Sequence, residues 1–141
     1  MSNALTAQQE RLIRDSFLDV REVAGALANL FYGRLFAIAP ELRPMFKGDI
    51  REQGLKLMSM LDSCVESLGR LEEIRPQLRE LGKRHVEYGT RTEHYPVVAK
   101  ALLWSLAQAL EHRFDKETKD AWTTLILGIA EEMQAGANSG S

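Results

Sequence analysis

The sequence predicts an all-α protein that folds as a single domain. Apolar residues recur at helical spacing along most of the chain, and no stretch shows the strict apolar–polar alternation of a strand. A chain of 141 residues is long enough for one sizeable core, and no repeat of fixed period is visible. We therefore expect six or seven helices joined by short links over residues 1–136, followed by a disordered polar tail over residues 137–141.

Two consecutive helices are expected before the first proline. Thr6 followed by Gln9 matches a capping box, and the apolar stripe behind it predicts a helix over Thr6–Val20. A second helix is expected over residues 21–39, because apolar residues keep helical spacing until a proline interrupts the backbone hydrogen bonds. The two prolines within residues 40–48 then predict a stiff, irregular corner.

The next helix is expected to begin at Asp49, a residue type that caps helix N-termini. Its apolar residues keep the spacing of one buried face over several turns, and Gln53 lies in line with them. They are Leu57, Met58, Leu61, Cys64, Val65 and Leu68. We interpret Cys64 as a small core residue, because it continues this face.

His85 lies on the apolar face of a helix that Pro76 begins. Leu78, Leu81 and His85 recur at helical spacing, so the imidazole shares a face with core residues. A buried imidazole needs a hydrogen-bond partner for each ring nitrogen, or a metal on one of them. These residues alone leave two interpretations open, an ordinary core histidine and a ligand of a metal or haem.

Two further helices are expected after His85. A polar connection covers residues 89–94, Pro96 suits the first turn of the helix that follows, and Phe114-Asp115 separates it from the last helix. The apolar stripes of the two helices comprise Val98, Leu102, Leu103, Leu106 and Leu110, and then Trp122, Leu125, Ile126, Ile129 and Met133. Gly136 precedes the polar tail.

Composition narrows the classes of function. The net charge of −2, with both signs interspersed, argues against a nucleic-acid-binding protein. No signal-peptide pattern and no membrane-spanning apolar stretch is visible, so we expect a cytoplasmic protein with no membrane partner. Cys64 is the only cysteine, which fits a reducing compartment, and without a Cys-x-x-Cys-His motif any haem would be held non-covalently.

Five features occur in a fixed order along the chain. They are Phe31-Tyr32, the corner from Pro40 to Phe46, Gln53-Gly54, His85 and Tyr95-Pro96. This order resembles that of the bacterial single-domain haemoglobins and of the globin domain of flavohaemoglobins, over about residues 6–133. The resemblance implies a globin fold, a three-over-three helical sandwich around a pocket that holds haem b (iron protoporphyrin IX).

The resemblance also implies a role for each matching residue. His85 would be the proximal haem ligand, with an acceptor on its other ring nitrogen that fixes the tautomer. Phe46 would pack on the haem face, and Leu57 would close the ligand cavity. Tyr32 and Gln53 would be the distal pair, whose donors stabilise bound dioxygen. The simpler alternatives are core packing for Phe46 and Tyr32, and an exposed amide for Gln53.

Four other residues extend this expected site. Gly54 and Ala28 would form a close crossing of two helices that sets the depth of the pocket. Lys56 and Arg84 are candidates for binding the haem propionates, because both follow residues of the ligand face. The alternative for these two cations is that they are merely solvated, as exposed basic residues on helices usually are.

One position departs from the flavohaemoglobin pattern. In that family a tyrosine near Tyr95 and a glutamate on the last helix form a network behind the proximal histidine. Tyr95 is present, but the matching position on the last helix is Ala137. The missing carboxylate weakens the case for peroxidase-like chemistry. Glu131 or Glu132 would replace it only in a different helix register.

The resemblance implies reversible binding of dioxygen, with nitric oxide and carbon monoxide as further ligands. Bound dioxygen could also convert nitric oxide to nitrate, an enzymatic activity that needs a separate reductase, because we expect no reductase domain in this chain. Two other classes of function stay open. One is a haem-based gas or redox sensor acting through a partner protein, and the other is a helical interaction module without a cofactor.

Overall fold

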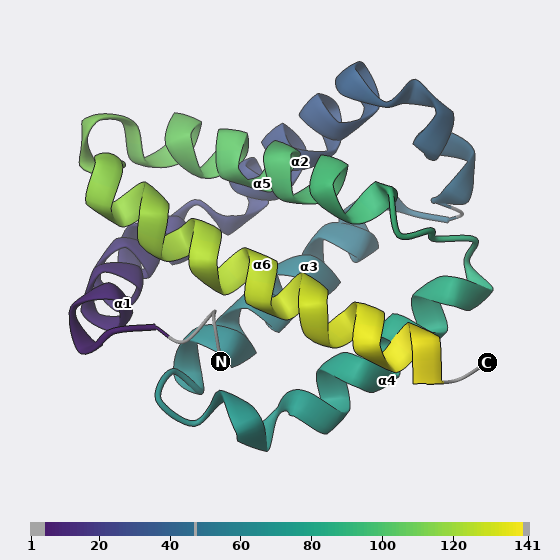
Figure 1. The fold of residues 1–141 in the computed structure, drawn as a ribbon. Coiled ribbons are helices and arrows are strands. Elements are labelled where there is room, and N and C mark those ends of the chain that lie inside the picture. The colour runs from purple at the N-terminus through teal and green to yellow at the C-terminus, as the bar shows by residue number, and fades with distance from the viewer. Residues whose placement is uncertain (1–4, 47, 140–141) are drawn as a thin grey trace.

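The computed structural model describes residues 5–46 and 48–139, and these residues are predominantly α-helical with no strand (Figure 1). The longer helices are α1 (Ala7–Glu22), α2 (Ala24–Ile38), α3 (Ile50–Glu66), α4 (Arg75–Glu87), α5 (His94–Leu110) and α6 (Lys116–Ser139). Short 3-10 helices cover Pro40–Met45, Leu71–Glu73 and Glu111–Arg113. The predicted all-α class is confirmed. Within the described part of the chain, no helix is both long and apolar enough to cross a bilayer.

The helices begin where local side-chain chemistry favours a start. The Thr6 hydroxyl accepts a hydrogen bond from the Gln9 backbone N–H (3.1 Å), and the Gln9 side chain accepts one from the Thr6 backbone N–H (3.0 Å). Asp49 accepts from the Arg51 backbone N–H (2.9 Å) at the start of α3. Pro76 lies in the first turn of α4. The predicted capping box and helix starts are therefore confirmed.

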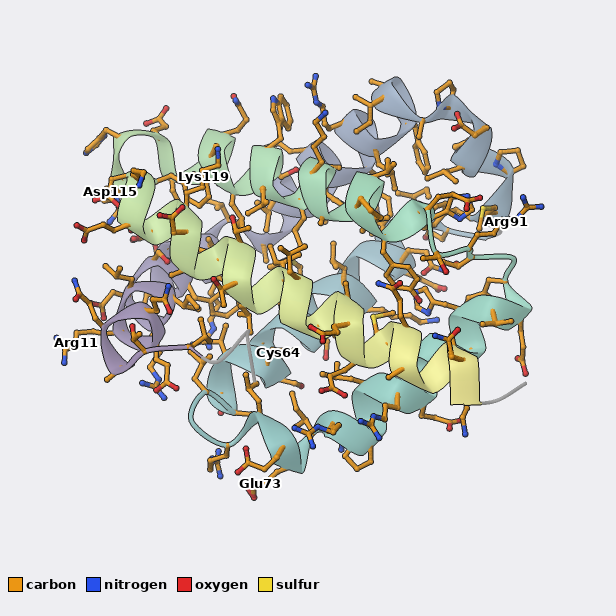
Figure 2. All side chains as sticks on the ribbon, viewed as in Figure 1. Arg11, Cys64, Glu73, Arg91, Asp115 and Lys119 are labelled. Carbon is orange, nitrogen blue, oxygen red and sulfur yellow. The ribbon has the colours of Figure 1, made fainter. Side chains whose placement is uncertain are left out.

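Two layers of three helices enclose the core. Helices α2, α5 and α6 form one layer and pack on α1, α3 and α4, with the main contacts between layers made by α4 and α1 on α6 and by α2 on α3 (Figure 1). Charged residues such as Arg11 and Glu73 lie at the periphery, whereas Cys64 lies inside (Figure 2). The buried Trp122 donates a hydrogen bond from Nε1 to Ser16 Oγ (2.9 Å). This arrangement is the predicted three-over-three sandwich.

The end of α6 differs from the expectation. We expected disorder from residue 137, but α6 continues through Gly136 to Ser139, while residues 140–141 lie outside the described residues. The reason is a tertiary contact that local composition does not reveal. Gly136 packs against the backbone of Arg79 in α4, so it belongs to a helix crossing and does not end the helix.

Helix α4 lies on α6 with the two backbones in direct contact. A Cβ atom added to Gly82 would overlap the carbonyl oxygen of Met133, and one added to Gly136 would overlap the carbonyl oxygen of Arg79. Only glycine permits this approach from both sides. We call this pair of contacts the glycine crossing.

The glycine crossing yields a prediction about stability. Gly82→Ala should lower the free energy of unfolding by about 1–3 kcal/mol or more, because the new methyl group forces the two helices apart. Gly33→Ala in α2 is the matched control: no atom lies within 4 Å of its added Cβ. It should stabilise the protein by about 0.5–1 kcal/mol through helix propensity. Urea denaturation measures both, and equal stabilities for the two variants would contradict the crossing.

Candidate functional site

His85 lies in the last turn of α4, where its ring is half-buried. Nδ1 donates a hydrogen bond to the carbonyl oxygen of Leu81 at 2.8 Å, which leaves Nε2 as the nitrogen with the free lone pair. Burial lowers the pKa of His85, and the nearby charge of Arg84 lowers it further, against the opposing effect of the Leu81 hydrogen bond. The imidazole is thus neutral at neutral pH, with its tautomer fixed for coordination through Nε2.

Tyr32 and Phe46 meet in an aromatic cluster at the end of α2. Their ring centroids lie 5.5 Å apart, and Phe36 contacts both, at 6.0 Å from Tyr32 and 5.3 Å from Phe46. Tyr32 is 6% exposed, so its ring belongs to the core. Burial raises the pKa of Tyr32 to about 12, so the phenol keeps its proton and remains a hydrogen-bond donor.

The N-terminal part of α3 crosses α2 closely, as predicted. A Cβ atom on Gly54 would lie 2.9 Å from Ala28 Cβ, closer than carbon atoms normally approach, so the glycine is needed for this contact. Gln53 precedes it and is half-buried. Leu57, one turn later, is also half-buried and packs against the core.

A cavity of about 410 Å³ lies between α3 and α4. Lys56 and Arg84, both exposed, line it from the two opposing helices, and neither forms an ion pair with a described residue. The remaining lining residues are Leu55, Ser59, Met60, Ser63, Cys64, Ile74, Gln77, Leu78 and Leu81. His85, Tyr32 and Gln53 are not among them, so the cavity adjoins the expected ligand residues without containing them.

Cys64 forms part of the inner wall of this cavity and is 1% exposed. Its Sγ atom lies 3.7 Å from Met60 Sδ, one turn earlier on α3. Burial raises the pKa of the Cys64 thiol to about 12. The interpretation of this cysteine as a small core residue is confirmed.

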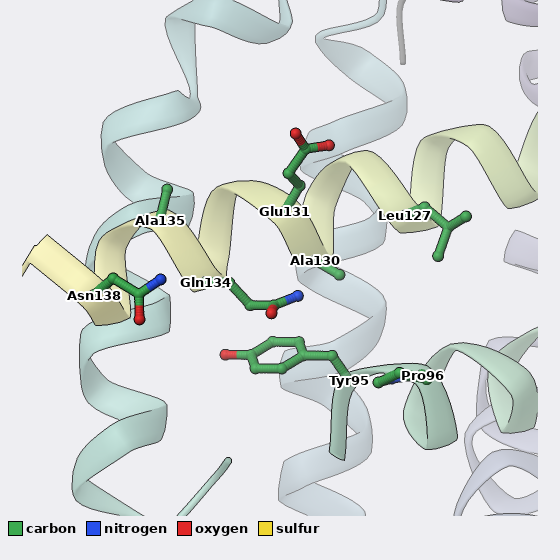
Figure 3. Close-up of a pocket in the computed structure, with 8 residues that line it drawn as sticks. All are labelled: Tyr95, Pro96, Leu127, Ala130, Glu131, Gln134, Ala135 and Asn138. Atoms are coloured by element: carbon green, nitrogen blue, oxygen red, sulfur yellow. The ribbon is translucent and has the colours of Figure 1, made fainter. Parts of the chain in front are cut away.

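Tyr95 lies apart from the α3–α4 cavity, in a groove of about 360 Å³ between the start of α5 and the second half of α6. Figure 3 shows the Gln134 side chain beside the Tyr95 ring and the Glu131 carboxylate directed away from it. Burial raises the pKa of Tyr95. The sequence analysis did not identify Gln134, although it lies one turn before Ala137 on α6 and its polar side chain faces this tyrosine.

Glu132 does not occupy the place of the missing carboxylate behind His85. Its two carboxylate oxygens pair with Arg75 Nε (3.2 Å) and Arg79 Nε (3.1 Å) of α4. Ala137 is half-buried and is not one of the residues that line the groove around Tyr95. Glu131 lines the groove around Tyr95, whereas the Glu132 carboxylate is paired with the two arginines of α4.

These residues suit a particular kind of group. One neutral imidazole offers a single nitrogen to a metal, aromatic rings offer a flat apolar surface, and two unpaired cations at a cavity can bind anionic substituents. Among the described residues, no three His, Cys, Asp or Glu side chains gather to hold a metal ion by themselves. A flat, largely apolar metal complex with anionic substituents fits this donor set.

Comparison with known proteins places the chain in a family. A model of the globin family matches residues 29–133. The flavohemoprotein of Bordetella parapertussis is 27% identical over 145 residues, covering 96% of this chain and 36% of that protein, so the chain spans about a third of this relative's length. An anaerobic nitrite reductase of Oryza sativa subsp. indica is 31% identical over 140 residues, covering 92% of this chain and 96% of that protein.

Solved structures have the same architecture. A bacterial globin from Campylobacter jejuni has a TM-score of 0.84 and 27% sequence identity, covering 95% of this chain and 97% of its own. A hexacoordinated heme protein from an anhydrobiotic tardigrade has a TM-score of 0.86 at 16% identity, covering 95% and 96%, and this likeness concerns the fold alone. Because the globin family model matches most of the length of this chain, the chain belongs to the globin family.

Proposed function

We propose that this globin binds haem b non-covalently, with His85 Nε2 as the proximal iron ligand, and that it binds dioxygen reversibly. The observation that carries the proposal is the hydrogen bond from His85 Nδ1 to the Leu81 carbonyl oxygen (2.8 Å). It leaves a neutral nitrogen available at the apolar face of α4, beside a cavity lined by two cations. Membership in the globin family supports the same cofactor.

A bound haem would supply an iron that can take a diatomic ligand. The chain's own residues would hold that ligand and exclude water. Tyr32 keeps its phenol proton because of burial, and Gln53 carries amide N–H donors, so both can donate hydrogen bonds to bound dioxygen. Phe46 and Leu57 would provide apolar walls that limit access of water.

We further propose that the protein converts nitric oxide to nitrate. One dioxygen molecule, one nitric oxide molecule and one electron give one nitrate ion, so each turnover needs an electron from a separate reductase. The similarity to the globin part of a flavohemoprotein supports this proposal. The test is anaerobic reduction of the oxidised protein by host-cell reductases, followed by measurement of nitric oxide consumption in air. Failure of every reductase would leave dioxygen binding as the function.

Replacing the proximal ligand should abolish normal loading with haem. We expect His85→Leu to lose the absorption spectrum of the wild-type protein in its oxidised, reduced and carbon monoxide forms, because no other nitrogen takes the place of Nε2. His112→Leu, an exposed histidine, is the matched control and should leave the spectrum unchanged. An unaltered spectrum for His85→Leu would disprove the proximal assignment.

Removing either distal donor should speed the release of dioxygen. One hydrogen bond to a charged acceptor contributes about 1–3 kcal/mol, so Tyr32→Phe and Gln53→Leu should each raise the dissociation rate by roughly 5- to 150-fold. Stopped-flow displacement by carbon monoxide measures this rate. Gln108→Leu replaces an exposed glutamine of α5 and should have no effect. If neither distal variant released dioxygen faster, the distal assignment would be wrong.

The two cations of the cavity should slow the loss of haem. Exposed ion pairs contribute about 0.2–1 kcal/mol, so Lys56→Met and Arg84→Met should each raise the rate of haem transfer to an acceptor protein by up to about fivefold. High salt should reduce the difference from wild type. Lys119→Met, an exposed lysine on α6 (Figure 2), is the control. Rates equal to that of the control would show that neither cation contacts the propionates.

A further inference from the structure

The glycine crossing lies close to His85 along α4. Gly82 precedes His85 by less than one helical turn, and its contact on α6 is the backbone of Met133. The second contact is reciprocal, because there α6 supplies the glycine, Gly136, and α4 supplies the backbone, at Arg79. Each helix therefore presents one glycine to a carbonyl group of the other. The separation of the two helix axes is as small as backbone atoms allow.

Helix α4 has little other support. Its extensive contacts are with α6, whereas its contacts with α3 are sparse and the cavity separates the two. Glu132 of α6 adds ion pairs to Arg75 and Arg79, but these side chains are partly exposed and long, so they hold the helices together without fixing their distance. The backbone contact at the two glycines is the rigid constraint on the position of α4.

We propose that Gly82 and Gly136 are positioning residues for the haem iron, because they set where α4 places the imidazole of His85. The proposal rests on haem binding through His85. A helix moves as a rigid body over one turn, so a displacement at Gly82 reaches His85 almost undiminished. A methyl group at either glycine requires a displacement of roughly an ångström or more, whereas a preorganised site tolerates about 0.5 Å.

The layered arrangement determines the direction of this displacement. Helices α3 and α4 belong to one layer and α6 to the other. Pushing α4 off α6 therefore moves α4 away from the α6 layer, at right angles to the direction from α4 to α3. The imidazole would then be displaced and reoriented together with α4. An Nε2 atom moved from its preorganised position would form a weaker bond to the iron of a bound haem.

The test uses Gly82→Ala and Gly136→Ala in the full chain loaded with haem. In the reduced, ligand-free proteins, resonance Raman spectroscopy should show the iron–histidine stretching band at lower frequency than in wild type. Haem loss should be roughly 10-fold faster or more, as for other groups that orient a metal ligand. Gly33→Ala, whose added methyl contacts nothing within 4 Å, should show the wild-type band and rate.

A second experiment separates positioning from general destabilisation. In His85→Gly protein supplied with free imidazole, the ligand is no longer attached to α4, so adding Gly136→Ala should leave the iron–imidazole band in place. An equal shift with the attached and the free ligand would overturn the proposal. Glu132→Gln should also leave the wild-type band unmoved. A shift as large as that of Gly136→Ala would assign the positioning to the ion pairs instead.

The outcomes distinguish this inference from the proposed function. A wild-type protein without any iron–histidine band would contradict haem ligation by His85. A normal wild-type band that both alanine variants leave unmoved would contradict only the positioning role. One methyl group costs less than the usual stability of a domain, and haem binding adds to that stability, so folded variants are expected. Gly136→Ala decides if Gly82→Ala does not fold, because it places a methyl group in the same crossing from the other helix.

Discussion

The helix that carries His85 is supported mainly from one side, and the candidate site depends on this constraint. Two glycines allow α4 to lie directly on the backbone of α6, so α4 keeps its place without filling the space toward α3. If α4 were held by side chains packed against α3, those side chains would occupy the cavity that Lys56 and Arg84 now line. A tight contact on one face of a helix thus preserves open space on another.

Much of the fold could be predicted from local pattern. The capping box at Thr6 and the start of α3 after Asp49 depend on residue types at short spacing, and both are confirmed. The crossing of Gly54 with Ala28, which the family resemblance implied, is also confirmed. The extent of α6 could not be predicted this way. Gly136 usually marks the end of a helix, but here its lack of a side chain serves a contact with Arg79, a residue far away in the sequence.

In the candidate site, too, features set within one helix could be predicted, whereas features set by the packing of two helices could not. The half-burial of His85 and its need for a hydrogen-bond acceptor follow from its spacing within one helix, and Leu81 of that helix meets the need. The neighbours of Tyr95 could not be predicted, because they depend on how two helices are rotated against each other. Gln134 faces its ring while Glu131 points away, and no pattern within α6 distinguishes these two residues.

The burial of the Cys64 thiol affects how readily reactive gases, such as the proposed ligands, can modify the protein. Only thiolates react readily with oxidants, and burial raises the pKa of this thiol to about 12, so the thiol keeps its proton at neutral pH. The single sulfhydryl group is therefore withheld from nitrosation, sulfenic acid formation and cross-linking between copies of the chain. A protein exposed to reactive gases can retain a cysteine in its interior without becoming their target.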